Sequence, residues 1–104
     1  MLYYKIYSTN ESHEWVTFIH GAGGSSSVWF RQIREFKEHY NVLLIDLRGH
    51  GNSKQERMRE KLSEYTFNDL AQDVIHVLDH LNIKKSHFVG ISLGTVIVRV
   101  LAEN

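Results

Sequence analysis

Apolar side chains in this chain gather in short runs that are separated by stretches with helical spacing. Runs with little alternation between apolar and polar residues occupy 14–19, 41–45 and 86–91, and a shorter aromatic and β-branched run occupies 3–7. A continuous apolar run is typical of a strand that is covered on both faces of a sheet. The pattern therefore predicts four strands.

Three other stretches show the spacing of helices. Trp29, Ile33 and Phe36 recur three or four residues apart within 28–38, which predicts a helix there. A second helix is predicted from Thr66 onward, because Thr66 and Asp69 are spaced as an N-terminal cap. Its apolar stripe comprises Phe67, Leu70, Ala71, Val74, Val77, Leu78 and Leu81.

The third helical stretch, 95–101, is apolar almost all round, which predicts a helix buried in the centre of the fold. The elements then follow the order strand, strand, helix, strand, helix, strand, helix. Such alternation predicts an α/β fold with a mostly parallel sheet, right-handed crossovers and helices on both faces. The first two strands are joined by a short polar turn, so we expect them to pair antiparallel.

Composition narrows the classes of partner. The 104 residues carry 12 basic and 12 acidic side chains and no cysteine. Zero net charge gives no field that attracts nucleic acid or an anionic membrane, and the lack of cysteine excludes disulfides and thiolate metal sites. No apolar run approaches membrane-spanning length, and the first residues lack the layout of a signal peptide. We therefore expect one cytoplasmic domain, with neither nucleic acid nor membrane as a partner.

Glycine-rich loops follow three of the predicted strands. They occupy 20–27 and 47–53, and the third is the sequence Gly90-Ile91-Ser92-Leu93-Gly94. The last reads G-x-S-x-G between a strand and a helix, which is the setting of a nucleophile elbow. Because the carboxyl ends of parallel strands meet at one edge of a sheet, we expect the three loops to lie together.

This arrangement predicts a nucleophilic serine with donors for an oxyanion. Ser92 would sit on the sharp turn, and the two glycines around it would let strand and helix approach closely. The backbone N–H of Leu93 is one expected oxyanion donor. The loop after His20 would supply the second, with the N–H of Ala22 preferred and that of Gly23 next.

The motifs together resemble the α/β-hydrolase superfamily. They are His20-Gly21-Ala22-Gly23, then Trp29, then the loop 46–53, and finally Gly90-Ile91-Ser92-Leu93-Gly94. The chain is similar to the branch of small esterases, lactonases and C–C-bond hydrolases. Serine at position 92 argues against the dehalogenase and epoxide-hydrolase branches, which carry aspartate there. Thr95 departs from the glycine that many relatives have at that position.

The resemblance implies a serine hydrolase acting on an ester, thioester, lactone or C–C bond of a small acyl substrate, with no cofactor and no metal. It makes Ser92 the nucleophile and the N–H groups of Ala22 and Leu93 the oxyanion donors. It assigns loop-shaping roles to His20, Gly21, Gly23, Gly90 and Gly94.

The family places its triad acid and histidine after the nucleophile, whereas 12 residues follow Ser92 here and none is a histidine. The resemblance therefore implies that 1–104 is a partial core domain without the C-terminal strands and cap. We expect such a piece to be inactive by itself. A non-catalytic fragment or interaction module is the alternative, and the open edge of strand 86–91 would then favour self-association.

Particular residues admit other interpretations. His20 and His50 are the two histidines on loops at the expected catalytic edge, where a base would have to lie. The glycines from Gly21 to Gly24 also suggest a dinucleotide loop, but Ser26 stands where the third glycine of G-x-G-x-x-G is needed. His76 and His80 share a helix face without the glutamate of a zinc-binding motif, so a solvated face is favoured.

Overall fold

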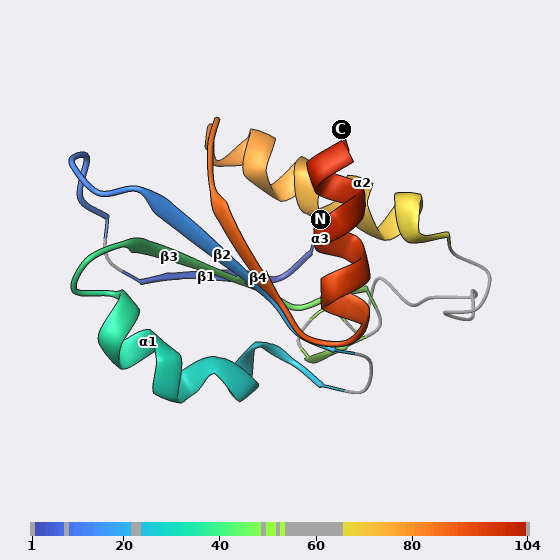
Figure 1. Ribbon diagram of the computed structural model, residues 1–104, viewed down its shortest axis with the longest axis horizontal. Coiled ribbons are helices and arrows are strands. Elements are labelled where there is room, and N and C mark those ends of the chain that lie inside the picture. The colour runs from blue at the N-terminus through green and yellow to red at the C-terminus, as the bar shows by residue number, and fades with distance from the viewer. Residues whose placement is uncertain are drawn as a thin grey trace.

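The computed structural model describes residues 2–7, 9–21, 24–48, 50, 51, 53 and 66–103. Four strands form one sheet in the order β1-β3-β2-β4 (Figure 1). They are β1 (Tyr4–Tyr7), β2 (Trp15–Ile19), β3 (Asn41–Ile45) and β4 (His87–Gly90). Strand β2 pairs in parallel with both β3 and β4, while β1 pairs antiparallel with β3.

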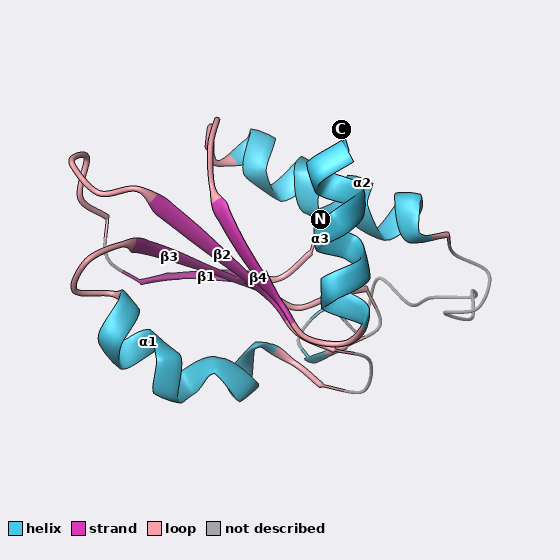
Figure 2. Cartoon of the chain, viewed as in Figure 1, coloured by secondary structure: helices cyan, strands magenta, loops and turns pink. Residues whose placement is uncertain are grey.

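Helices cover both faces of this sheet (Figure 2). A 3₁₀ turn, η1 (Ser26–Trp29), leads into α1 (Phe30–Phe36) on one face. Helices α2 (Phe67–His80) and α3 (Leu93–Glu103) lie together on the other. The predicted fold class, a mostly parallel α/β sheet between helices, is therefore confirmed. No helix among the described residues is long and apolar enough to cross a membrane.

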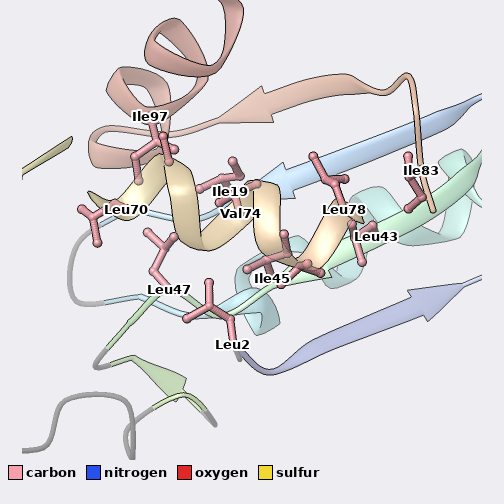
Figure 3. Close-up of a cluster of buried hydrophobic side chains, with 12 residues drawn as sticks. Leu2, Ile19, Leu43, Ile45, Leu47, Leu70, Val74, Leu78, Ile83 and Ile97 are labelled. Atoms are coloured by element: carbon pink, nitrogen blue, oxygen red, sulfur yellow. The ribbon is translucent and has the colours of Figure 1, made fainter. Parts of the chain in front are cut away.

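The alternation of side chains along the central strands divides the core into two clusters. Val16 and Phe18 of β2 face η1 and α1, and Phe18 packs on Trp29 of η1 with ring centroids 4.8 Å apart. Ile19 of the same strand faces the opposite cluster, built on α2 and α3. In Figure 3, Leu70, Val74 and Leu78 of α2 lie over Leu43 and Ile45 of β3, and Ile97 of α3 joins them.

Helix α2 begins at the predicted cap. The Thr66 hydroxyl accepts the Asp69 N–H at 3.0 Å, and the Asp69 carboxylate accepts the Thr66 N–H at 2.9 Å. These two bonds satisfy donors that the first turn of a helix leaves unpaired. The buried stripe begins at Leu70 rather than at Phe67, whose side chain is 51% exposed.

The expected antiparallel pairing of the first two strands is wrong, because β3 lies between them. The segment from β1 to β2 crosses the start of β3 and is held there by Asn41. Its side-chain oxygen accepts the Asn10 N–H at 2.6 Å, and its amide donates to the carbonyls of Asn10 and His13 at 2.9 and 3.1 Å. A short loop can therefore skip one strand, since a buried side chain replaces the hairpin hydrogen bonds.

The prediction of a last helix buried in the centre of the fold is also wrong for the described residues. Among residues 93–102 of α3, only Gly94 and Ile97 are buried, and the other side chains are partly or fully exposed. Helix α3 packs mainly on β4, α2 and β2. Most side chains of this apolar helix are therefore only partly covered by the rest of the described structure.

Candidate active site

Ser92 lies on the tight turn between β4 and α3. Its φ is 55°, in the left-handed region that residues with a side chain seldom adopt. The Ile91 N–H still donates to the Ile19 carbonyl of β2 at 3.3 Å, whereas the Thr95 N–H already donates to the Ser92 carbonyl at 2.9 Å. The strand therefore becomes a helix within one residue, and the Ser92 side chain is exposed at that point.

Glycines at positions 90 and 94 permit this turn. A Cβ atom on Gly90 would lie 2.5 Å from the carbonyl of Gly94, one helical turn ahead. A Cβ atom on Gly94 would overlap the carbonyl oxygen of Ile19, at the end of the neighbouring strand. The helix can start directly beneath the strand ends only because both positions lack a side chain.

The N-terminus of α3 presents a free donor beside Ser92. The Leu93 N–H has no acceptor among the described residues, as expected for the first residue of a helix. Helix N-termini also carry a partial positive charge. The turn can therefore stabilise negative charge that develops next to the Ser92 hydroxyl.

The loop after β2 meets this turn, as the sequence predicted. Figure 1 shows the carboxyl ends of β2 and β4 at the same end of the sheet, where α3 begins. A Cβ atom on Gly21 would lie 3.1 Å from the Ile91 carbonyl oxygen and 3.2 Å from the Ser92 Cβ. The other two predicted residues of this loop, Ala22 and Gly23, lie outside the described residues.

His20 is fully buried at the end of β2, and both of its ring nitrogens are engaged. Nδ1 donates to the Gly21 carbonyl at 2.7 Å, and Nε2 accepts the Leu47 N–H at 2.9 Å. Burial lowers the pKa of His20 below its ordinary value, and nearby His50 lowers it further, against opposing contributions from the Gly21 bond and Asp46. Neither nitrogen is left to accept a proton from Ser92.

His50, the other histidine considered as a base, is tied to its own loop. Its Nδ1 bonds the Arg48 carbonyl oxygen at 2.9 Å, and its ring centroid lies 5.1 Å from that of His20. Within the described part of the chain, the Ser92 hydroxyl makes no hydrogen bond to a histidine. The described residues thus contain the serine that the sequence predicts as nucleophile and one candidate donor, but no histidine in contact with that serine.

The loop after β3 is fixed by a carboxylate and an ion pair. The Asp46 carboxylate accepts the Ser26 N–H at 2.7 Å, which joins this loop to the start of η1. Arg48 makes two hydrogen bonds to the Asp73 carboxylate of α2, at 2.7 and 2.6 Å. The sequence did not identify Asp73 as the partner of Arg48, which lies 25 residues earlier in the chain.

His76 and His80 both lie on the exposed side of α2. Among the described residues, no group of three or more histidine, aspartate or glutamate side chains is arranged to hold a metal ion.

Comparison with known proteins identifies the family. The family model of the α/β-hydrolase fold matches residues 14–104, and the chain therefore belongs to this family. Over 79 residues it is 37% identical to 3-oxoadipate enol-lactonase 1 of Acinetobacter baylyi, covering 76% of this chain and 27% of that protein.

Solved structures agree with this assignment. A hydrolase from Pseudomonas aeruginosa PA01 superposes with a TM-score of 0.85 at 30% identity, covering 97% of this chain and 36% of that one. An enol-lactonase from Burkholderia xenovorans LB400 gives a TM-score of 0.83 at 29% identity, covering 97% and 37%. The chain thus spans 27% to 37% of the length of these relatives.

Proposed function

We propose that the full-length protein is a serine hydrolase in which Ser92 is the nucleophile. One observation carries the proposal: Ser92 stands in a left-handed conformation between a strand and a helix, against Gly21 and beside the Leu93 N–H, for which the described residues offer no acceptor. Strained backbone held by its surroundings is a feature of functional sites. The family of the chain supports the same reaction class.

The proposed reaction has two stages. In the first, the Ser92 Oγ forms a bond to the acyl carbon, its proton passes to a base, and the carbonyl π electrons move to the oxygen. The N–H groups of Leu93 and Ala22 are the proposed donors to that oxyanion. Collapse expels the leaving group, which takes up the proton, and leaves an ester on Ser92. In the second stage, the oxygen of a water molecule bonds to the acyl carbon, the bond from that carbon to the Ser92 Oγ breaks, the carboxylic acid is released and Oγ regains a proton.

The proposed substrate is a small carboxylic ester or lactone. Enol-lactonases are among the proteins that this chain is similar to. This similarity favours cleavage of an acyl C–O bond over cleavage of a thioester or a C–C bond. Ile91, adjacent to the nucleophile, is 51% exposed and offers an apolar contact to the acyl group. We propose no cofactor for this chemistry, because hydrolysis needs only a nucleophile, a base, oxyanion donors and water.

We propose that the base and its acid come from parts of the full-length protein outside 1–104. The described histidines make no bond to Ser92, and the chain spans 27% of the length of its enol-lactonase relative. The isolated 104-residue chain is accordingly expected to show no catalytic turnover, since a serine without a base is a weak nucleophile.

A fluorophosphonate probe tests the assignment. The full-length gene product should be labelled covalently, and peptide mass spectrometry should locate the adduct on Ser92. Labelling should be lost in Ser92→Ala and retained in Ser12→Ala, which removes an exposed hydroxyl from the loop before β2. Equal labelling of the Ser92→Ala variant would show that another residue is the nucleophile.

A further inference from the structure

The Thr95 hydroxyl forms a hydrogen bond across the turn that carries Ser92. Thr95 lies in the first turn of α3, and its Oγ1 donates to the carbonyl oxygen of Gly90, the last residue of β4, at 3.1 Å. The backbone N–H of the same threonine donates to the Ser92 carbonyl at 2.9 Å. One residue of the helix therefore bonds the chain both before Ser92 and at Ser92 itself.

The acceptor of this bond belongs to a peptide group that is held from two sides. The peptide that joins Gly90 to Ile91 also carries the Ile91 N–H, which donates to the Ile19 carbonyl of β2 at 3.3 Å. In a planar trans peptide, the C=O and the N–H point in opposite directions. Strand β2 thus fixes this peptide from one side, and the Thr95 hydroxyl fixes it from the other.

The two bonds of Thr95 enclose the strained residue. Ser92 has a φ of 55°, and a left-handed conformation of a residue with a Cβ atom persists only where its surroundings hold it. Rotation of this angle toward negative values would change the direction in which α3 leaves β4. The Thr95 Oγ1 would then move away from the Gly90 carbonyl, so the bond opposes relaxation of the turn.

A short side chain can make this contact because β4 and α3 approach each other closely. A Cβ atom on Gly90 would lie 2.8 Å from the Thr95 backbone nitrogen. The β-branched side chain of threonine has few χ1 rotamers, and in helices one of them lets the hydroxyl bond an earlier backbone carbonyl. Many α/β hydrolases have glycine at this position, and glycine offers no hydroxyl. The bond is therefore a feature of this chain rather than of the family motif.

We propose that Thr95 is a positioning residue: its hydroxyl fastens the end of β4 to α3 and so keeps Ser92 in the left-handed conformation from which Oγ attacks the substrate. This inference rests on the proposed serine-hydrolase function. In this role Thr95 acts through the backbone of Gly90 and Ser92, and not on the substrate.

Substitutions at position 95 separate the hydroxyl from the rest of the side chain. Valine has nearly the shape of threonine but no donor, while serine keeps the donor without the methyl group. Alanine also removes the donor, and it is the best helix former, so it does not weaken α3. Comparison of the three variants therefore distinguishes loss of the hydrogen bond from a change of shape or of helix stability.

The rate of attack by Ser92 should follow the hydroxyl. The full-length gene product is assayed with p-nitrophenyl acetate, because kcat/KM reports the first stage whichever stage limits turnover. Thr95→Val and Thr95→Ala should each lower kcat/KM about three- to tenfold, the loss expected for one hydrogen bond. Thr95→Ser should stay within about twofold of the wild type. Wild-type kcat/KM in the valine or the alanine variant, or an equal loss in the serine variant, would overturn the proposal.

A threonine at the start of another helix provides the matched control. The Thr66 hydroxyl accepts the Asp69 N–H at the N-terminus of α2, so Thr66→Val also removes a hydrogen bond from a helix terminus. It should lower the melting temperature at least as much as Thr95→Val does and leave kcat/KM unchanged. An equal loss of kcat/KM in Thr66→Val would show that the rate follows stability rather than the geometry of the turn, and the proposal would be wrong.

Fluorophosphonate labelling measures the same geometry without turnover. The second-order rate constant for labelling of Ser92 should fall in Thr95→Val in the same proportion as kcat/KM, and it should recover in Thr95→Ser. A rate constant in Thr95→Val equal to that of the wild type would contradict the positioning role.

Failure of the underlying function gives a different result. If Ser92→Ala still hydrolyses the ester like the wild type, the serine-hydrolase proposal itself is wrong, and the inference on Thr95 falls with it. If Ser92→Ala is inactive but the valine and alanine variants of Thr95 match the wild type, only the positioning role of Thr95 is overturned.

Discussion

Gly94 packs so tightly beneath Ile19 that a methyl group on the glycine would overlap the isoleucine carbonyl oxygen. Elsewhere in a helix, replacing glycine with alanine stabilises by about 1 kcal/mol. Here the sign should reverse, and Gly94→Ala should lower the free energy of unfolding by about 2 kcal/mol or more through steric overlap. Denaturant unfolding measures this. Arg99→Ala, at an exposed position of the same helix, should change stability by less than about 0.5 kcal/mol.

The left-handed backbone of Ser92 makes a second prediction. Both Ser92→Gly and Ser92→Ala remove the hydroxyl, but only glycine adopts a φ of 55° without steric cost. That cost is about 1–2 kcal/mol for a residue with a Cβ, and the greater freedom of glycine in the unfolded chain offsets part of it. In denaturant titrations, the free energy of unfolding of Ser92→Gly should therefore be about 1 kcal/mol higher than that of Ser92→Ala. Equal stabilities would contradict a strained elbow.

The ion pair between Arg48 and Asp73 should couple the loop after β3 to α2. Their side chains are only 23% and 19% exposed, and Arg48 contacts both carboxylate oxygens. A double-mutant cycle with Arg48→Lys and Asp73→Asn should give a coupling of about 1–2 kcal/mol.

The pair His87–Glu14 provides the comparison for that cycle. Its side chains are 58% and 76% exposed, so solvent screening should reduce its coupling to less than about 0.5 kcal/mol. Similar coupling in both cycles would show that the bidentate geometry of Arg48 contributes nothing.

Buried His20 predicts a pH dependence of stability. Its pKa in the folded chain lies below the ordinary value of 6.5 that applies after unfolding. The unfolded state therefore binds more protons as the pH falls below 6.5, and folding becomes less favourable. The contribution of His20 is fully present above pH 6.5 and is lost as the pH falls through the folded pKa.

The difference in unfolding free energy between wild type and His20→Asn isolates this contribution from the other histidines. It should be largest near pH 8 and shrink steadily toward pH 5. A difference that stays constant, or grows on acidification, would mean that His20 is not held neutral in the fold.

Self-association through β4 remains a proposal. In the described part of the sheet, β4 is bonded to β2 on one side and to no strand on the other, and an open strand edge favours pairing between chains. Sedimentation velocity on the 104-residue chain should show an average mass that rises with concentration. His87→Lys, which adds charge beside Lys84 and Lys85, should weaken the association, whereas His39→Lys on the exposed loop after α1 should not. Monomers at every concentration would contradict the proposal.

Much of the site could be predicted from the sequence because its signals are local. The turn at Ser92 needs glycine at positions 90 and 94, since close backbone contacts within and beneath the turn exclude a Cβ there, and those residues are visible in the sequence. The cap formed by Thr66 and Asp69 is likewise a matter of spacing three residues apart. Local sterics and short-range hydrogen bonds act through neighbours along the chain.

What only the tertiary structure decided depends on residues far apart in sequence. The strand periodicity could not show that the segment from β1 to β2 crosses the start of β3, because that crossing depends on the Asn41 side chain meeting Asn10, 31 residues earlier in the chain. The pairing of Arg48 with Asp73 and the two bonds of His20 are of the same kind. The sequence by itself determined the strands, the helices and the tight turn at Ser92. The packing of those elements determined which polar side chains meet, since only folding brings the ends of separate strands together.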